Sequence, residues 1–291
     1  MSAALPRRRP ALGSLTTTPT RPRKAAPMLG ETVTLNAERG VTLTCYVQPV
    51  DGEFAGVTAR PAVLILPGGG YQYCSDREAD PVAYPFLAAG YQAFVLRYSV
   101  GDQGAWPRPL DDYEQAMAQL TANAEAWHLD PTKIAVIGFS AGGHLAAVAA
   151  TMAEHRPAAA ILGYPVILPE IADRCRPGMP YPAEHVTADT APTFLFHTRD
   201  DDVTVVENTL AFASALAGAG VPFEAHVYSY GAHGFSTGAA HLNPRPLSPR
   251  ARSWVPESIA WLDETLGALT ASGIGEPRLS SDGATGGRTP A

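Results

Sequence analysis

The strongest constraint on the fold is a series of short apolar runs that alternate with longer segments of helical periodicity. Residues 62–66 (Ala-Val-Leu-Ile-Leu) form one such run, and a proline and three glycines follow it directly. An uninterrupted apolar run of this length is typical of a strand buried on both faces, as in a parallel sheet covered by helices. The alternation therefore predicts an α/β fold in which a mostly parallel central sheet carries helices on both faces. We expect strands at residues 32–35, 41–47, 62–66, 92–96, 133–137, 158–162, 193–197 and 223–228, the first two as a hairpin, and helices ending at Gly90 and at residues 110–127, 141–153, 205–216 and 254–266.

The two ends of the chain differ in composition from its middle. Residues 1–28 are rich in Pro, Arg, Thr and Ala without apolar periodicity, and the last twenty or so are rich in Gly, Ser, Thr and Pro. Segments of this kind bury too little apolar surface to offset the entropy lost on ordering. We predict one α/β domain at residues 29–268, a disordered N-terminal segment at 1–28 and a disordered tail at 269–291. Met28 is an alternative start of translation.

Charge and hydropathy exclude two classes of partner. The formal net charge is −7, and much of the positive charge lies in the head, so the predicted domain is more acidic than the total. An acidic domain lacks the basic footprint of a nucleic-acid-binding protein. No stretch approaches the roughly 18 apolar residues of a membrane span. We therefore expect no nucleic-acid and no membrane partner. The basic residues of the head are Arg7, Arg8, Arg9, Arg21, Arg23 and Lys24.

Cysteine usage and the N-terminal sequence bear on the compartment. The run Arg7–Arg9 is not followed by the apolar core of about 7–15 residues that a signal peptide needs. Cys45, Cys74 and Cys175 show no metal-site spacing, and their odd number offers no disulfide framework. These observations predict a cytoplasmic protein without a metal. They leave the oligomeric state unknown.

The segment Gly138-Phe-Ser-Ala-Gly142 fits the pattern G-x-S-x-G, and it stands between a predicted strand and a predicted Ala-rich helix. This strand–turn–helix setting is what a nucleophile elbow requires, because the serine then projects above the edge of the sheet. The helix N-terminus at Ser140 favours developing negative charge, and the glycines allow strand and helix to pass closely. We predict that Ser140 is a nucleophile. The alternative is a Gly-rich turn with an incidental serine.

Gly68, Gly69 and Gly70 follow the predicted strand at 62–66, one strand–helix unit before the elbow. Without side chains, such residues can turn backbone N–H groups toward an oxyanion. We expect these glycines to form an oxyanion hole together with the N–H of Ala141, the residue after the serine. A loop without a role in catalysis is the alternative.

Three consecutive aspartates, Asp200, Asp201 and Asp202, come after the predicted strand at 193–197 and before a helix. A carboxylate at such a strand end can orient an imidazole and stabilise its cation. Residue types alone do not decide which of the three would do so. Capping of the following helix is an alternative role for part of this run.

His233 lies in a loop between glycines, after the last predicted strand. A histidine there can reach the serine hydroxyl as a base, and it completes the chain order Ser…Asp…His of α/β hydrolases. His226 in the middle of a strand and His241 in a Pro-rich loop are weaker candidates. His144, one helical turn after the serine, is expected to be a packed structural residue. His185, His197 and the aspartates lack metal-site spacing.

Several motifs together resemble the acetyl-xylan-esterase-like carbohydrate esterases of the α/β-hydrolase superfamily. The likeness covers roughly residues 35–266, and the elbow is its most specific part. It implies the α/β-hydrolase fold, deacetylation of sugars or hydrolysis of small esters, and no cofactor. The motifs are Leu-Pro-Gly-Gly-Gly-Tyr at 66–71, Ser-Asp-Arg-Glu-Ala at 75–79, Gly-Tyr-Gln-Ala-Phe-Val-Leu-Arg-Tyr-Ser at 90–99, Ile-Ala-Val-Ile-Gly-Phe-Ser-Ala-Gly-Gly-His-Leu-Ala at 134–146 and Ala-Pro-Thr-Phe-Leu-Phe-His-Thr at 191–198.

Carried over residue by residue, the resemblance implies a catalytic triad of Ser140, Asp201 and His233. Its acid motif, His-Thr-x-x-Asp, selects Asp201 among the three aspartates. Its oxyanion glycines fall on Gly69 and Gly70. Two positions depart from many relatives, since Pro67 stands where His is common and Val205 where Pro is common. Both changes could shift loops, and with them acyl preference.

We therefore predict a serine esterase that cleaves short-chain acyl esters through an acyl-enzyme, with O-acetyl groups on small-molecule or oligosaccharide substrates as the expected target. The segment of about 26 residues between Tyr164 and Ala191 contains five prolines, too many for a large helical lid over a long acyl chain. An amide or arylformamide hydrolase and a feruloyl-type esterase are alternatives on the same triad. A non-catalytic binding protein on a hydrolase scaffold is an alternative of another class.

Overall fold

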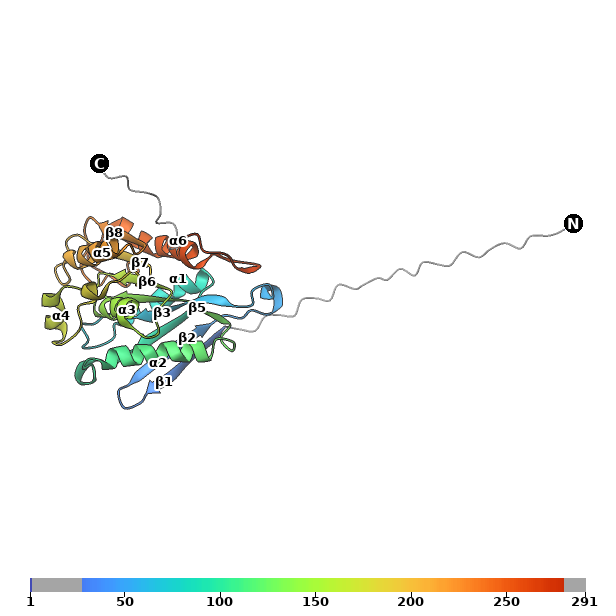
Figure 1. Cartoon of the computed structure of the whole chain (residues 1–291), viewed down its shortest axis with the longest axis horizontal. Coiled ribbons are helices and arrows are strands. Elements are labelled where there is room, and N and C mark those ends of the chain that lie inside the picture. The colour runs from blue at the N-terminus through green and yellow to red at the C-terminus, as the bar shows by residue number, and fades with distance from the viewer. Residues whose placement is uncertain (2–27, 280–291) are drawn as a thin grey trace.

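The computed structural model describes Met1 and residues 28–279, and its centre is an eight-stranded sheet (Figure 1). The strands are β1 (Leu29–Asn36), β2 (Val41–Val47), β3 (Arg60–Leu66), β4 (Gln92–Arg97), β5 (Leu129–Phe139), β6 (Ala159–Gly163), β7 (Thr193–Thr198) and β8 (Phe223–Tyr228). Their order across the sheet is β1-β2-β4-β3-β5-β6-β7-β8. The hairpin β1–β2 and the pair β2–β4 are antiparallel, and all the other neighbours in this sheet are parallel.

Helices cover both faces of this sheet (Figure 1). The alternation of side chains along β3 shows which helices pack on each face. Ala62 and Leu64 belong to one buried cluster with residues of α2, α3 and α5. Val63 and Ile65 point to the other face and belong to a second cluster with residues of α1 and α6. The predicted fold, a mostly parallel sheet between two helical layers, is thus confirmed. The helices are α1 (Asp80–Ala88), α2 (Arg108–Ala122), α3 (Ala141–Met152), α4 (Pro169–Cys175), α5 (Glu207–Ala219) and α6 (Trp254–Leu266).

One helix is shorter than its apolar pattern predicts. The sequence indicates a helix over 110–127, but α2 ends at Ala122. The carbonyl of Gln119 accepts hydrogen bonds from both the backbone N–H and the side chain of Asn123, at 3.1 and 2.8 Å, which caps the C-terminus of α2. Trp127 still reaches the core through the following turn, where its ring centroid lies 5.3 Å from that of Phe94. Its burial therefore extends the apolar pattern beyond the end of the helix.

The end of the chain also differs from its predicted boundary. Residues 269–279, which the sequence assigns to a disordered tail, contain a short hairpin of β9 (Leu269–Thr270) and β10 (Gly273–Ile274). The backbone N–H of Gly275 donates to the carbonyl of Ala268 at 2.9 Å, and that of Arg278 donates to Glu264 in α6 at 2.7 Å. These hydrogen bonds hold the segment against the last helix. The predictions of disorder for residues 2–27 and 280–291 lie outside the described residues.

The junction between β5 and α3 is packed too closely for side chains at two positions. A Cβ on Gly142 would lie 2.1 Å from the carbonyl oxygen of Leu66 and 2.4 Å from that of Pro67. A Cβ on Gly138 would lie 2.2 Å from the carbonyl oxygen of Gly142. Both distances are far below van der Waals contact, so the first turn of α3 can lie against the end of β3 only because these residues are glycines.

We predict opposite effects of two Gly-to-Ala substitutions on the free energy of unfolding. Gly142→Ala forces a methyl group into backbone and should lower it by about 3 kcal/mol. Gly218→Ala, on the exposed side of α5 with nothing within 4 Å of its Cβ position, should raise it by about 0.5 kcal/mol. Urea unfolding of both variants measures the difference. A Gly142→Ala protein as stable as the wild type would contradict this description of the junction.

Candidate active site

Ser140 lies on the sharp turn between β5 and α3, with φ +53° and ψ −116°. This backbone conformation is rare for a residue with a side chain, and surrounding contacts must hold it. The N–H of Ser140 donates to the carbonyl of Gly163 at 3.0 Å, and its carbonyl accepts from the N–H groups of His144 and Val166 at 3.0 and 3.1 Å. The side chain is 7% exposed and faces a cavity.

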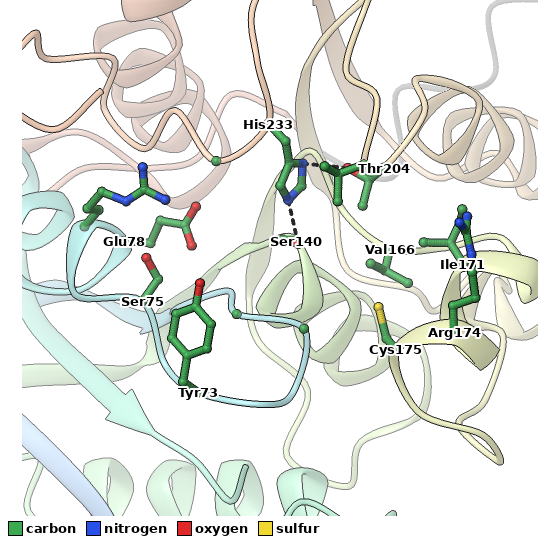
Figure 2. A pocket seen from close by; sticks show the side chains of 15 residues that line it. Tyr73, Ser75, Glu78, Ser140, Val166, Ile171, Arg174, Cys175, Thr204 and His233 are labelled. Atoms are coloured by element: carbon green, nitrogen blue, oxygen red, sulfur yellow. Dashed lines mark hydrogen bonds between the residues drawn. The ribbon is translucent and has the colours of Figure 1, made fainter. Parts of the chain in front are cut away.

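The imidazole of His233 lies between Ser140 and Asp201 (Figure 2). Its Nε2 is 2.9 Å from the Oγ of Ser140, and its Nδ1 is 2.8 Å from the Oδ2 of Asp201. His233 comes from the loop after β8, and Asp201 from the loop after β7. Because β5, β7 and β8 are parallel, these loops leave the same edge of the sheet, where the three predicted residues meet.

Of the three aspartates, the structure brings Asp201 to the histidine. Asp200 instead accepts a hydrogen bond of 2.7 Å from the N–H of Gly231, while the side chain of Asp202 is exposed. Asp201 is buried, and its Oδ1 accepts from the N–H groups of Val203 and Thr204 at 2.9 and 3.0 Å.

Burial by itself raises the pKa of Asp201, but hydrogen bonds outweigh it. The hydrogen bonds from His197 and His233 lower the pKa most, and the hydrogen bond from the N–H of Val203 lowers it further. The pKa therefore lies well below its usual range, because each donor stabilises the ionised form. The carboxylate is charged at neutral pH and acts as the acceptor for His233.

The three glycines of the loop after β3, Gly68, Gly69 and Gly70, have different roles. The N–H of Gly68 donates to Oε2 of Glu78 at 2.9 Å, so this donor is already used. Gly69 and Gly70 line the cavity beside Ser140, and both have positive φ, 129° and 61°. A Cβ on Gly69 would lie 2.0 Å from the carbonyl oxygen of Tyr73, which restricts this position to glycine. The N–H of Ala141 is at the first position of α3, directly after Ser140.

Three side chains that the sequence did not single out complete the site. Glu78 is 3% exposed, and its Oε1 accepts a hydrogen bond of 2.6 Å from the hydroxyl of Tyr164. The same hydroxyl accepts from the N–H of Ser236 at 3.0 Å, and the ring of Tyr164 lies 5.0 Å from that of His233. The Oγ1 of Thr204 lies 3.0 Å from Nδ1 of His233. The sequence gives no signal for these contacts, since all of them join segments far apart in the chain.

The remaining histidines of the core have structural partners. His144, as predicted, is packed in the core, and its ring nitrogens lie 2.9 Å from the hydroxyl of Tyr71 and 2.9 Å from the carbonyl of Pro180. Burial lowers the pKa of His144 to about 4, so the ring is neutral at pH 7. The ring of His197 is held by Thr204 and Thr209.

The described residues offer neither a metal cluster nor a membrane span. Between residues 28 and 279, no group of three or more His, Cys, Asp or Glu side chains is arranged to hold a metal ion. Within the same range, no helix has the length and apolar character needed to cross a bilayer.

The chain matches two protein families and is similar to several solved structures. Residues 55–162 match the family described as BD-FAE, and residues 178–246 match the prolyl oligopeptidase family. The crystal structure of MGS-M1, an α/β-hydrolase enzyme from a Medee basin deep-sea metagenome library, is 44% identical, with a TM-score of 0.76. The match covers 82% of this chain and 98% of that one. The chain belongs to the α/β-hydrolase family. The predicted membership is thus confirmed.

Further relatives place the chain within the acetyl-xylan-esterase-like α/β hydrolases. An acetyl ester-xyloside bifunctional hydrolase from Caldicellulosiruptor lactoaceticus is 30% identical, with a TM-score of 0.70 and coverage of 80% of this chain and 96% of that one. An acetylxylan esterase from Xylanibacter ruminicola is 32% identical over 61% of this chain. Endo-1,4-beta-xylanase B from Butyrivibrio fibrisolvens is also 32% identical over 61% of it. The matches span 41% and 33% of these two relatives, respectively.

We predict that removing the charge of Asp201 lowers turnover far more than removing that of its neighbour. Asp201→Asn disfavours the His233 tautomer that keeps Nε2 free to accept a proton, and should lower kcat by about 10²–10⁴-fold. Asp202→Asn removes the same charge from an exposed side chain and should change kcat by less than about twofold. Steady-state kinetics on nitrophenyl acetate compares the two variants. A larger loss in Asp202→Asn would show that the geometry assigns the wrong aspartate.

Proposed function

We propose that this protein is a serine esterase that hydrolyses short-chain acyl esters, above all O-acetyl groups on carbohydrates. The observation that carries the proposal is the continuous hydrogen-bonded series from Ser140 through His233 to Asp201, with distances of 2.9 and 2.8 Å, at a cavity of about 310 Å³. A serine hydroxyl is a weak nucleophile alone, and a neighbouring base held by a third group activates it.

In this mechanism, Ser140 attacks the carbonyl carbon of the ester while Nε2 of His233 takes the hydroxyl proton. Asp201 keeps the proton on Nδ1 and stabilises the imidazolium. The imidazolium then protonates the departing alcohol, and an acyl group remains on Ser140. Water repeats the sequence, so that the acid leaves and the serine regains its proton.

The negative charge of each tetrahedral intermediate falls on the former carbonyl oxygen. We assign its stabilisation to the N–H groups of Gly69, Gly70 and Ala141, which lie in the glycine loop and at the N-terminus of α3. Loss of one such donor typically costs about 3–4 kcal/mol of transition-state stabilisation. Glu78 supports this assignment, because it occupies the N–H of Gly68 and thereby fixes the loop that carries the other two donors.

Size and lining of the cavity favour a short acyl group. The segment between Tyr164 and Ala191 contributes the seven-residue helix α4, which supplies Ile171, Arg174 and Cys175 to the cavity wall. We expect this wall to limit the room for the acyl group, so that longer acyl chains gain little further burial. Two relatives named for acetyl esters or acetylxylan support acetate as the acyl group.

The compartment belongs to the same proposal. The three cysteines are free thiols in the described part of the chain, which is compatible with a reducing environment and supports a cytoplasmic location. The substrates we propose are small molecules or oligosaccharides, and the mechanism requires no cofactor.

We predict the acyl preference from these features. On a nitrophenyl ester series, kcat/KM should peak at about two to four acyl carbons and fall steeply by about eight, since added methylenes, each worth about 0.8 kcal/mol when buried, find no pocket. Acetylated xylo-oligosaccharides should release acetate. Ser140→Ala, the matched control, should release none above background.

A preference for eight carbons or more, without acetate release from any sugar, would rule out this function. The match to the prolyl oligopeptidase family makes amide and arylformamide substrates the relevant comparison, and feruloyl esters belong in the same panel. Faster hydrolysis of any of these would assign the triad to that substrate instead.

A further inference from the structure

The cavity at Ser140 has two unlike walls (Figure 2). On one side of the serine stand Tyr73, Ser75 and Glu78, all from the loop and short helical turn that follow β3. The apolar side chains of Val166, Ile171 and Cys175 line the opposite side, where the charged Arg174 of α4 also lies. All four come from the segment after β6. The two parts of an ester that meet at the carbonyl therefore encounter different surfaces.

We propose that the sugar of the substrate binds to the polar wall, with one face of its ring stacked on Tyr73, and that Tyr73 thereby selects carbohydrate esters over simple alkyl esters. The proposal rests on the proposed esterase function and specifies which side of the cavity receives the alcohol. The apolar wall is left for the acyl group.

Tyr73 is positioned to form such a platform. Its side chain is 59% exposed although it lines the cavity. Its Cδ2 would lie 3.2 Å from a Cβ on Gly69, so the ring stands directly beside a proposed oxyanion donor. The backbone N–H of Tyr73 donates to the carbonyl of Gly69 at 3.4 Å, which ties the two residues together. An aromatic ring with one free face offers apolar area at little cost in conformational entropy.

Charged groups at the edge of the same cavity suit the rim of a sugar ring. A Cβ on Gly234 would lie 3.4 Å from Nη2 of Arg77, 3.9 Å from Nη2 of Arg245 and 3.9 Å from Oε1 of Glu78, so these three charged groups converge at the cavity edge. Both oxygens of Glu78 already accept hydrogen bonds, from Gly68 and Tyr164, so the two arginines are the groups left to bind a sugar. Guanidinium groups donate hydrogen bonds, and the oxygen of a sugar hydroxyl accepts them. Among the described residues, neither arginine forms an ion pair within 4.0 Å with a protein carboxylate, and Nη2 of Arg245 donates a hydrogen bond to the carbonyl of His233.

The opposite wall suits the acyl group for the complementary reason. Val166 is fully buried and Ile171 nearly so, and both contribute apolar atoms beside Ser140. A sugar placed there would leave the hydroxyl groups that face Val166 and Ile171 without partners, which costs free energy for each. A methyl group would lose only its contact with water. The chemistry of the two walls thus orients the ester with its alcohol toward Tyr73.

The test compares kcat/KM on an acetylated xylo-oligosaccharide with that on methyl acetate, both followed by acid release. Methyl acetate has no ring to stack, so the ratio of the two values isolates recognition of the sugar. In Tyr73→Ala this ratio should fall about five- to tenfold, mainly through a higher KM for the sugar ester. Tyr73→Phe keeps the ring and should retain most of the wild-type ratio. Tyr84→Ala is the matched control: Tyr84 is 58% exposed on α1, away from the cavity lining, and the ratio should not change.

Three results would overturn the proposal. An unchanged ratio in Tyr73→Ala would place the sugar elsewhere, and an equal loss in Tyr73→Phe and Tyr73→Ala would assign recognition to the hydroxyl group instead of the ring. Equal losses on both substrates in Tyr73→Ala would make Tyr73 a support of the glycine loop. In each case the wild type still cleaves both esters, which separates these outcomes from failure of the esterase function itself, where the wild type would release acetate from neither.

Discussion

The close contact between the first turn of α3 and the end of β3 sets the geometry on which the rest of the site depends. The carbonyl oxygens of Leu66 and Pro67 lie where a side chain on Gly142 would be, so the helix starts directly against the central strand. This contact forces the chain through the positive φ of Ser140. The same turn lifts the hydroxyl into the cavity and leaves the N–H of Ala141 at the helix N-terminus, beside the glycine loop.

Parallel strands then bring the partners of the serine to the same edge of the sheet. Asp201 and His233 follow β7 and β8, and a network of buried hydrogen bonds fixes the loops that carry them. Glu78 and Tyr164 join the segments that follow β3, β6 and β8. Glu78 accepts hydrogen bonds from Gly68 and Tyr164, and the Tyr164 hydroxyl accepts one from Ser236. A buried carboxylate with both oxygens engaged holds the glycine loop relative to the histidine loop. The distances among Ser140, His233 and Asp201 are therefore maintained by residues outside the proposed triad.

The sequence predicts the parts of this arrangement that depend on local pattern. Continuous apolar runs locate the central strands, and the strand–turn–helix setting singles out Ser140. The same apolar pattern predicts too long a helix at residues 110–127, because Trp127 packs in the core from a turn after α2.

Roles that depend on contacts between distant segments cannot be predicted from the local sequence pattern. Three adjacent aspartates offer the same side chain, and within the sequence only the resemblance to a family favours Asp201. The hydrogen bonds of the folded chain distinguish it from Asp200 and Asp202. The roles of Glu78 and Thr204 follow from partners distant in the chain, so no spacing reveals them. The unlike walls of the cavity likewise appear only after the segments that follow β3 and β6 are placed on either side of Ser140.

Covalent labelling tests most directly whether the turn and the hydrogen bond that Ser140 donates to Nε2 of His233 make this serine a nucleophile. The protein is treated with a fluorophosphonate, digested, and the modified peptide is identified by mass spectrometry. We expect one equivalent of label on Ser140 and a much slower reaction in His233→Ala, which retains the serine but lacks the proposed base. Stoichiometric labelling of another residue, or an esterase-active protein that leaves Ser140 unmodified, would contradict it.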